Sequence, residues 1–336
     1  MEPLVSIILL DWNGLELVKQ ALPTIKELNY KNYELIFVDN GSRDNASIEY
    51  VKSFFPSARI IKNTQNIGYA GALNKVVPLA RGEYLFFIQN DVKLNSNCLK
   101  ELVYYAEEDP QVAICVPKQF SYDGKYILNF GIGMDIFGYP FYTHNLKEEK
   151  VFYADGAAFF VRKKVFLELE GFDEKHVAFA EDIDLCWRMW LKGYKLRRVP
   201  SAIVYHMGGA TIKGSIVRGH KHITSILRRY LTERNTLRNL IKNYSSSTLF
   251  IILPFYLIMF TIEMLFFLFL GYRAVARDVY LKALMYNIIN LQDTIKKRKK
   301  IQRERVISDW KIFKKIMLNK FYKWEVFKRI GIPLVR

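Results

Sequence analysis

Acidic residues recur along this 336-residue chain at positions suited to chemistry. Asp11 and Asp39 each end a short apolar run, Asn90-Asp91 follows another, and Glu181-Asp182-Ile183-Asp184 opens a stretch of helical spacing. Carboxylates at such positions can accept hydrogen bonds, bind a divalent cation or remove a proton. His206 follows a later extended run and could supply a nitrogen ligand. The order of these groups makes them the first candidates for a site.

Short strands and amphipathic helices would have to position these residues. Apolar, β-branched runs alternate with stretches of helical spacing through the first 120 residues, which predicts a parallel sheet covered on both faces. Ligands of such sheets bind at the carboxyl ends of the strands, where Asp11, Asp39 and Asp91 lie. The predicted strands are Val5–Leu10, Leu35–Val38, Arg59–Ile61, Tyr84–Ile88 and Val112–Val116, and the predicted helices are Leu15–Leu28, Ile48–Phe55, Ala70–Ala80 and Leu99–Ala106.

The middle of the chain leads to a second acidic segment. Residues 120–160 are rich in Gly, Tyr and Phe, which predicts irregular strands and loops that close at Asp155-Gly156. A helix over about 181–192 follows, with its acidic residues in the first turn, where the helix dipole favours negative charge. Two short extended runs then lead to His206.

Composition excludes several classes of protein. Apolar residues make up 51% of the chain and no Gly-, Pro- or Ser-rich tract occurs, which predicts a folded protein. Cys98, Cys115 and Cys186 lack any CxxC spacing, which argues against a disulfide framework and a zinc cluster. No signal-peptide pattern precedes Val5, so we expect the N-terminal half in the cytosol. The net charge of +17 is concentrated in residues 273–336, with 18 Lys or Arg and 5 Asp or Glu, and no nucleic-acid motif accompanies it.

An apolar run near the C-terminus predicts contact with a membrane. Leu249–Leu270 would be roughly 33 Å long as a helix, although Pro254 and Glu263 interrupt its apolar character. A single span would put the basic tail opposite the cytosolic half, against the tendency of basic segments to stay cytoplasmic. We therefore favour a re-entrant or in-plane helix, followed by an amphipathic helix from Val279 with a cationic edge at 296–300. A buried core helix with a solvated basic tail is the alternative.

Five motifs, taken together, resemble the inverting glycosyltransferases of family 2, especially their rhamnosyltransferase-like branch. The resemblance covers roughly residues 4–212 and implies a GT-A fold, which is an α/β, Rossmann-like fold with a mostly parallel mixed sheet. We therefore predict a catalytic domain over 1–245 and, from the apolar run and the basic tail, an apolar and basic helical membrane-associating region over 246–336. The motifs are Ile7-Ile8-Leu9-Leu10-Asp11-Trp12-Asn13-Gly14, Phe37-Val38-Asp39-Asn40-Gly41-Ser42, Asn66-Ile67-Gly68-Tyr69-Ala70-Gly71-Ala72-Leu73-Asn74, Asn90-Asp91 and Glu181-Asp182-Ile183-Asp184-Leu185-Cys186-Trp187-Arg188.

The resemblance implies a site for a nucleotide-diphosphate sugar. Asp39 is expected to accept hydrogen bonds from the base or the ribose, with Asp11 on the other side of the base, and Asp155 is expected to bind sugar hydroxyls. Gly68 lies where backbone must pass close to a ligand or a packed strand. The full set of expected donor-binding residues is Asp11, Asn13, Asp39, Asn66, Gly68, Asn74, Asn90, Asp155 and Gly156.

Catalytic roles follow from the same resemblance. Asp91 and His206 are the expected ligands of Mg²⁺ or Mn²⁺, although Gln89-Asn90-Asp91 keeps only the last carboxylate of the family's acidic triplet. Asp182 is the expected general base, which would remove the proton of the acceptor hydroxyl. Glu181 and Asp184 are possible supporting residues. All three acids could instead simply stabilise the start of a helix.

The function expected from this resemblance is metal-dependent, inverting transfer of a sugar from dTDP-rhamnose or a UDP-sugar. The acceptor would be a hydroxyl of a lipid-linked or growing glycan at the cytoplasmic face of the membrane, with membrane lipids as partners. A homodimer is possible, because the apolar helices could pair with a second copy. A polyprenyl-phosphate sugar synthase is one alternative, and a non-catalytic membrane scaffold is another. No nucleic-acid partner is expected.

Overall fold

The computed structural model describes residues 2–142, 151–208, 216–218, 221–317, 320–331 and 334–335. The chain divides into two compact units. Unit 1 consists of Met1–Ile132, Tyr142–Met189 and Gly193–Ala210, and unit 2 of Gly133–Phe141, Trp190–Lys192 and Thr211–Arg336. The functional division into 1–245 and 246–336 stays a prediction.

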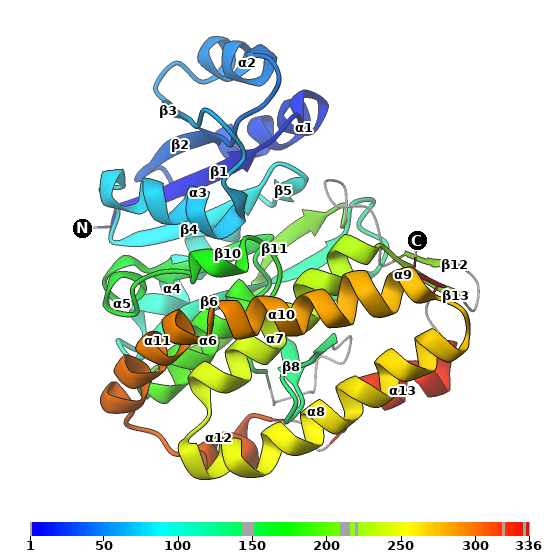
Figure 1. Cartoon of the computed structure of the whole chain (residues 1–336). Helices are drawn as coiled ribbons and strands as arrows, with labels where there is room; N and C mark the ends of the chain where they lie inside the picture. The colour runs from blue at the N-terminus through cyan, green and yellow to red at the C-terminus, as the bar shows by residue number, and fades with distance from the viewer. Residues whose placement is uncertain are drawn as a thin grey trace. The chain divides into compact units, whose positions relative to one another are not determined.

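Unit 1 is built on a nine-stranded mixed sheet with the order β3-β2-β1-β4-β10-β6-β11-β5, and β7 pairs with β6 (Figure 1). The first four strands of this order run parallel to one another, whereas β10 is antiparallel to both of its neighbours. The strands are β1 Val5–Asp11, β2 Tyr33–Asp39, β3 Arg59–Lys62, β4 Tyr84–Gln89, β5 Val92–Leu94, β6 Val112–Ser121, β7 Ile127–Asn129, β10 Ala158–Arg162 and β11 Lys195–His206.

Every strand and helix predicted for the first 120 residues is confirmed. The central strands are apolar at consecutive positions because helices cover both faces of the sheet, so Ile7, Ile8 and Leu9 are all buried. The two extended runs predicted before His206 form one strand, β11, with a register shift between Val199 and Ile203. The helices of unit 1 are α1 Leu15–Lys26, α2 Ala46–Phe54, α3 Gly68–Val76, η1 Val77–Leu79, α4 Cys98–Glu107, α5 Lys163–Glu168, η2 Glu174–His176 and α6 Glu181–Leu191.

Unit 2 is mainly helical. Its helix α7 packs against α10 and α11 and buries polar side chains, among them Arg238 and Asn287 of α10. Arg238 forms an ion pair with Asp293 and donates to Thr294 Oγ1 at 2.6 Å, which satisfies part of this buried polarity. The helices are α7 Ile226–Asn243, α8 Ser246–Phe269, α9 Arg273–Val275, the π-helix η3 Ala276–Leu281, α10 Lys282–Ile289, α11 Leu291–Glu304, α12 Asp309–Lys315 and α13 Tyr322–Ile330, and the short strands are β8 Ile132–Met134, β9 Pro140–Tyr142, β12 Ile216–Arg218, β13 Lys221–Thr224 and β14 Leu334–Val335.

The predicted apolar helix near the C-terminus is confirmed as α8. It is 24 residues long with a mean hydropathy of 2.3, so its length and composition would allow it to cross a membrane. Only 11% of this apolar window is buried, which is unlike the core helix of a folded domain. The predicted amphipathic continuation from Val279 is also helical, through η3, α10 and α11.

Candidate active site

Two predicted carboxylates lie side by side at the ends of adjacent parallel strands. Asp11 of β1 is paired in register with Asp39 of β2, and both are buried. Asp39 Oδ1 accepts a hydrogen bond from the Ser42 N–H at 3.1 Å, which is the turn role that its sequence context allows. Its Oδ2 is buried and has no hydrogen-bond partner among the described residues. Asp39 therefore forms the turn and also keeps one acceptor available.

Asn13 joins the loops that follow these two strands. Its N–H donates to Ser42 Oγ at 2.8 Å, and its Oδ1 accepts from the Arg43 N–H at 2.9 Å. The residue has a φ of +53°, a left-handed conformation that Asn tolerates better than most residues. Asn13 thus shapes the rim of the site beside Asp11 and Asp39.

The unusual Gln89-Asn90-Asp91 triplet has a local explanation. Asn90 Nδ2 donates to Asp11 Oδ1 at 2.5 Å, and both residues are buried. Burial raises the pKa of Asp11, and the bond from Asn90 opposes that shift. A carboxylate at position 90 would instead press against Asp11 with like charge. Asn90 is therefore a partner of Asp11 in this structure.

Asp91 and His206 are brought together by antiparallel pairing. Strand β11 pairs with β5 so that His206 lies opposite Val92, and His206 Nε2 is 3.5 Å from Asp91 Oδ2. Burial lowers the pKa of His206, but the negative charges of Asp91 and Asp155 outweigh it, so the net shift is upward. Asp91 Oδ1 is buried and has no hydrogen-bond partner among the described residues. A carboxylate oxygen with a neighbouring imidazole nitrogen is a donor set that suits Mn²⁺ or Mg²⁺ when substrate oxygens and water complete the coordination.

The Asp155-Gly156 loop precedes β10 and contacts helix α6. Asp155 accepts from the Ala157 N–H at 2.8 Å and from Asn129 Nδ2 at 3.3 Å. The Gly156 N–H donates to Asp182 Oδ2 at 3.1 Å, while the Gly156 carbonyl accepts from the Tyr69 hydroxyl at 2.5 Å. Tyr69 was not among the predicted site residues, although it lies inside one of the predicted motifs.

Asp182 lies in the first turn of α6, and its pKa is raised well above the usual value of an aspartate. Burial raises its pKa to about 7, with a further contribution from the charge of Asp155, and the N–H groups of Ile183 and Gly156 partly oppose the shift. Burial, and then the charge of Asp182, also raises the pKa of Glu181, whose Oε2 is buried without a hydrogen-bond partner. A group with a pKa near neutrality is suited to general acid–base work.

A strained loop holds the start of α6 in place. Val177, Phe179 and Ala180 have φ values of +64°, +66° and +62°, which such side chains rarely adopt. The Val177 carbonyl accepts from the Tyr69 N–H at 2.7 Å, and a Cβ added at Gly68 would lie 2.7 Å from the same carbonyl oxygen. Gly68 therefore permits the close approach of α3 to this loop. Nothing in the local sequence indicates the strain at Val177.

Two predicted donor-binding asparagines are engaged by the protein itself. Asn66 Oδ1 accepts from Asn40 Nδ2 at 3.0 Å and from the Gly68 N–H at 2.9 Å. The Asn74 carboxamide makes two hydrogen bonds with the backbone of Phe172, at 2.8 and 2.9 Å. The structure thus gives Asn66 and Asn74 positioning roles at the two ends of α3.

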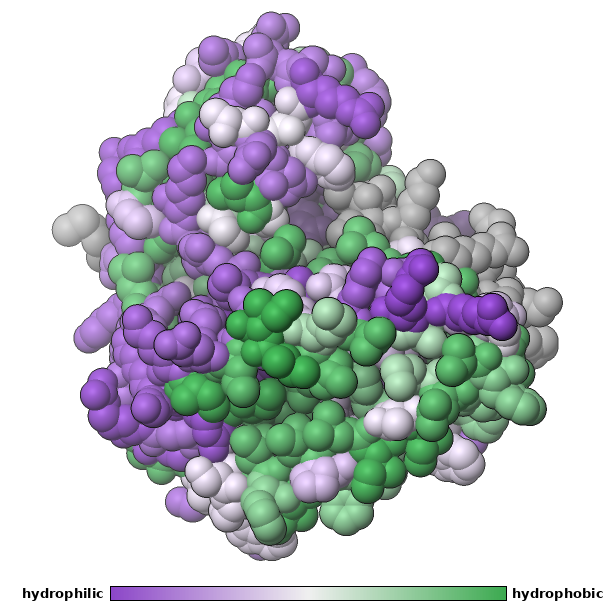
Figure 2. Space-filling model, viewed as in Figure 1, coloured by the Kyte–Doolittle hydropathy of each residue, from purple (hydrophilic) through white to green (hydrophobic). Residues whose placement is uncertain are grey.

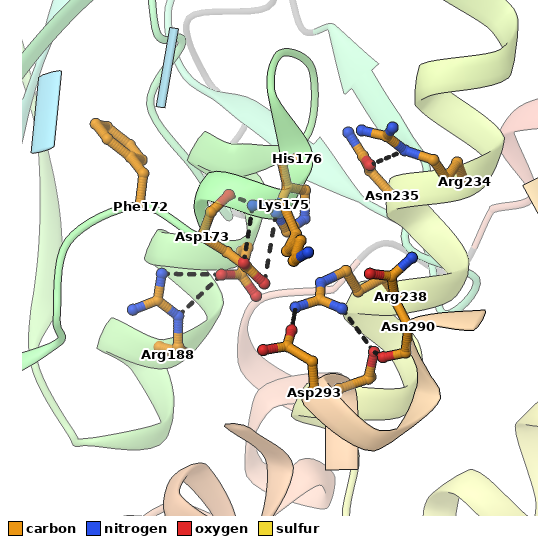
Figure 3. Close-up of polar contacts among 12 residues, drawn as sticks. Phe172, Asp173, Lys175, His176, Arg188, Arg234, Asn235, Arg238, Asn290 and Asp293 are labelled. Atoms are coloured by element: carbon orange, nitrogen blue, oxygen red, sulfur yellow. Dashed lines mark hydrogen bonds and ion pairs between the residues drawn. The ribbon is translucent and has the colours of Figure 1, made fainter. Parts of the chain in front are cut away.

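Asp184 belongs to a separate buried cluster, part of which Figure 3 shows. Its carboxylate pairs with Arg188 at 2.8 Å, and Arg188 also donates to the Gly171 carbonyl at 2.8 Å. One ligand atom each from Asp173, His176 and Asp184 lie within 4.8 Å of one another. Arg188 already supplies the positive charge that Asp184 needs, so we assign this cluster a structural role. It was not predicted as a group from the sequence.

Four carboxylate oxygens share an unusual property. Each is buried and lacks a hydrogen-bond partner within the described parts of the chain. A buried acceptor left unsatisfied costs about 1–3 kcal/mol, and more when it is charged. Each belongs to a motif that was singled out in the sequence. The four atoms are Asp11 Oδ2, Asp39 Oδ2, Asp91 Oδ1 and Glu181 Oε2.

Comparison with known sequences shows which proteins the chain is similar to. Residues 6–169 match the family model for glycosyl transferase family 2. The chain is 26% identical over 225 residues to the O-antigen chain rhamnosyltransferase RfbN of Salmonella typhimurium, a match that covers 60% of this chain and 66% of RfbN. It is 25% identical over 248 residues to the amylovoran biosynthesis glycosyltransferase AmsB of Erwinia amylovora, covering 68% of this chain and 79% of AmsB.

Another relative is much longer than this chain. The protein y4gI of Sinorhizobium fredii is 28% identical over 250 residues, which are 69% of this chain and 27% of y4gI. Thus the chain spans less than two thirds of the length of y4gI and just under two thirds of the length of RfbN.

Solved structures show the same fold at low sequence identity. The mannosyltransferase PcManGT from Pyrobaculum calidifontis, in complex with GDP-Man and Mn²⁺, aligns with a TM-score of 0.54 and 16% identity, covering 90% of this chain and 86% of PcManGT. GalNAc-T7 with UDP, GalNAc and Mn²⁺ aligns with a TM-score of 0.58 and 15% identity, covering 73% of this chain and 49% of GalNAc-T7. Residues 6–169 therefore match glycosyl transferase family 2, and the chain has the GT-A fold of these glycosyltransferases.

Proposed function

We propose that this chain transfers a sugar from a nucleotide-diphosphate donor to a hydroxyl group of a glycan, with inversion at the anomeric carbon. The observation that carries the proposal is the set of four buried, unpartnered carboxylate oxygens on Asp11, Asp39, Asp91 and Glu181. Such oxygens can accept hydrogen bonds from hydroxyl and imide groups of a ligand, or they can bind a cation. The match of residues 6–169 to glycosyl transferase family 2 supports a nucleotide sugar as the molecule that brings them.

Asp11 and Asp39 are proposed to bind the nucleoside of the donor. They lie in register at the carboxyl ends of β1 and β2, where ligands of α/β sheets bind. Each has one carboxylate oxygen that accepts a hydrogen bond from the protein and one without a partner. Each can therefore accept a hydrogen bond from the ligand and keep the hydrogen bond that holds it in place. Asn13, which connects the loops after these two strands, is proposed to lie beside the same nucleoside.

Asp91 and His206 are proposed to hold Mg²⁺ or Mn²⁺. When bound, the cation would stabilise the negative charge that develops on the diphosphate leaving group. The unpartnered Asp91 Oδ1 is the oxygen best placed to serve as its ligand. His206, whose Nε2 lies 3.5 Å from Asp91 Oδ2, would bind the cation in its neutral form. Both PcManGT and GalNAc-T7 were solved with Mn²⁺.

Asp182 is proposed to remove the proton from the acceptor hydroxyl. Its pKa of about 7 lets it be ionised at neutral pH and still take up a proton as the new bond forms. The Gly156 N–H fixes one of its oxygens, and the adjoining Asp155 is placed to bind hydroxyls of the donor sugar. This hydrogen bond between the loop and α6 supports roles for Asp182 and Asp155 in one site.

The donor and acceptor classes are proposed from the relatives. RfbN is named as a rhamnosyltransferase of the O-antigen chain, and AmsB as a glycosyltransferase of amylovoran biosynthesis. We therefore propose dTDP-rhamnose or a UDP-sugar as donor and a lipid-linked or growing envelope glycan as acceptor, at the cytoplasmic face of the membrane. The exposed apolar helix α8 is consistent with that location.

A thermal-shift and calorimetry panel tests the donor site. UDP, GDP, dTDP and CDP would each be added with and without Mn²⁺ or Mg²⁺ to the wild type and to Asp91→Asn. We expect one nucleotide to stabilise the wild type in a metal-dependent way, by about 2.7 kcal/mol at a ligand concentration 100-fold above Kd. The effect should be absent in Asp91→Asn and unchanged in Asp123→Asn, which alters an exposed loop carboxylate. Silence across the panel would support the non-catalytic scaffold instead.

A further inference from the structure

We infer that helix α8 lies in the plane of an anionic membrane surface and does not cross the bilayer. This arrangement deepens the proposed membrane location, and only its role in glycan synthesis rests on the proposed function. It concerns unit 2 alone, and its test does not require sugar transfer.

One face of α8 packs onto unit 2, and the rest is apolar and exposed. Tyr256, Phe260 and Phe267 are buried at positions that share one side of the helix. Around the other sides, Figure 2 shows a broad hydrophobic surface over α8 that extends to α10. Large side chains that form it include Phe250, Phe255, Ile258, Ile262, Leu265 and Phe269, of which Phe250 is 83% and Phe269 is 89% exposed. Water is a poor environment for so large an apolar surface.

The packed face also holds the only acidic residue of α8. Glu263 forms an ion pair with Arg229 of α7, and Lys323 Nζ of α13 lies 2.5 Å from Glu263 Oε2. Lys323 also pairs with Glu233 at 2.9 Å, so two acids and two bases form one network, which we call the Glu263 network. Arg229 additionally donates to the Tyr280 hydroxyl at 2.7 Å. The middle of α8 is thus bound to α7 and α13 by charge.

The Glu263 network opposes a spanning arrangement. A helix that crossed the bilayer alone would have to place Glu263 in hydrocarbon, which is unfavourable for an acidic residue. It would also separate Arg229 and Lys323 from Glu263, and breaking a buried ion pair is strongly destabilising. A helix lying on the surface keeps the network intact and still buries its exposed apolar faces in lipid.

Charge and aromatic residues of neighbouring helices identify the partner as anionic lipid. Lys296 and Lys299 of α11 are exposed on the segment that continues α10. Trp324 of α13 is 54% exposed, and Lys328 Nζ lies 5.2 Å from the centroid of its ring. Exposed tryptophan and lysine beside an apolar face are typical of helices at the headgroup level of a bilayer. A second copy of this basic unit would meet like charge over the same surface.

Cysteine accessibility separates the in-plane arrangement from a span. The full chain would be synthesised in the presence of vesicles of phosphatidylcholine and phosphatidylglycerol in equal amounts, with Ser247→Cys or Tyr272→Cys marking the two ends of α8. Native Cys98, Cys115 and Cys186 are buried and serve as the background. We expect a membrane-impermeant maleimide to label both positions in intact vesicles as fully as it does in detergent. Protection of one end until detergent is added would overturn the inference.

A charge placed on the exposed face tests the surface itself. Ile262→Glu should weaken binding to the mixed vesicles at least tenfold, whereas Leu79→Glu, the same kind of change on an exposed apolar residue of unit 1, should not alter it. Light scattering would show whether the wild type is a dimer that Ile262→Glu disrupts, in which case a second copy and not lipid covers this face. Unchanged vesicle binding by Ile262→Glu would also overturn the inference. Vesicle binding without nucleotide binding would leave it intact and refute the proposed function.

Discussion

The two units leave opposite kinds of groups unsatisfied. In unit 1, carboxylate oxygens of Asp11, Asp39, Asp91 and Glu181 are buried with no protein partner, while its apolar residues are mostly covered. In unit 2, acids such as Glu263 are paired with basic side chains, and no carboxylate oxygen among the described residues is buried without a partner. This contrast in carboxylates supports the two proposals made above, a polar donor with a cation as the ligand of unit 1 and lipid as the partner of unit 2.

The contrast is just as clear for apolar side chains. Among the described residues, 22 large hydrophobic side chains of unit 2 are exposed, against eight in unit 1. Unit 1 is the larger of the two, so size does not explain the difference. Because soluble domains rarely expose a large contiguous apolar surface, the excess indicates a partner for unit 2 that is itself apolar.

The largest expected effect comes from removing the proposed base of unit 1. Asp182→Asn keeps the size of the side chain but cannot take a proton, so kcat for transfer to a hydroxyl acceptor should fall about 10²–10⁴-fold. Nucleotide binding should persist. In the wild type, activity should rise as pH increases through about 7, because Asp182 must lose its proton to act.

Steady-state kinetics across pH, with Asp123→Asn as the control variant, would measure both effects. Full activity in Asp182→Asn would contradict the assignment of the base. It would favour a polyprenyl-phosphate acceptor, since a phosphate that is already ionised needs little help from a base.

A second effect concerns the charges that unit 2 keeps paired. Glu263→Gln leaves Arg229 and Lys323 without their shared carboxylate, so the free energy of unfolding should fall by about 1–3 kcal/mol. Asp278→Asn removes a surface carboxylate paired with Arg277 and Lys282, and such exposed pairs contribute at most about 1 kcal/mol. Denaturant unfolding of both variants would measure the difference. Equal losses would show that the Glu263 network contributes no more to the free energy of unfolding than a surface ion pair does.

Local patterns predicted most elements of unit 1, because strands and helices there follow the period of their apolar residues. The same patterns placed Asp39, Asp91 and Asp182 at strand ends and a helix start, where the structure has them. They missed Tyr69, whose hydroxyl meets Gly156 from 87 positions away. They also missed the left-handed Val177, whose carbonyl lies against Gly68 of α3, more than 100 positions earlier in the chain.

Unit 2 was harder to predict for a different physical reason. Helix α7 is polar along its length, which would ordinarily indicate a solvent-exposed helix. It is nevertheless buried, because Arg238 finds Asp293 and Thr294 on a helix more than 50 residues later in the chain. Asn287 likewise donates to the Arg234 carbonyl at 2.9 Å. Hydropathy cannot identify partners that only the tertiary fold supplies.

A smaller effect tests whether Tyr69 positions the proposed base. Without its hydroxyl, Tyr69→Phe no longer holds Gly156, whose N–H lowers the pKa of Asp182. The pH at which activity rises should therefore move upward, and kcat at neutral pH should fall by up to about tenfold, the value of one hydrogen bond. Tyr126→Phe, at an exposed tyrosine, is the control. Lower activity with an unmoved pH profile would mean that Tyr69 only supports the fold.

The smallest effect sharpens the role of positive charge in unit 2. Lys299→Gln removes one exposed cation from α11 without touching the apolar surface of α8. A basic residue near an anionic leaflet contributes about 1 kcal/mol, so binding to vesicles with phosphatidylglycerol should weaken about fivefold. Because salt screens this attraction, the difference between variant and wild type should shrink as ionic strength rises. Flotation at two salt concentrations measures it. An equal loss on vesicles of phosphatidylcholine alone would show that Lys299 acts through packing, and the apolar face of unit 2 would then account for membrane binding without help from its charge.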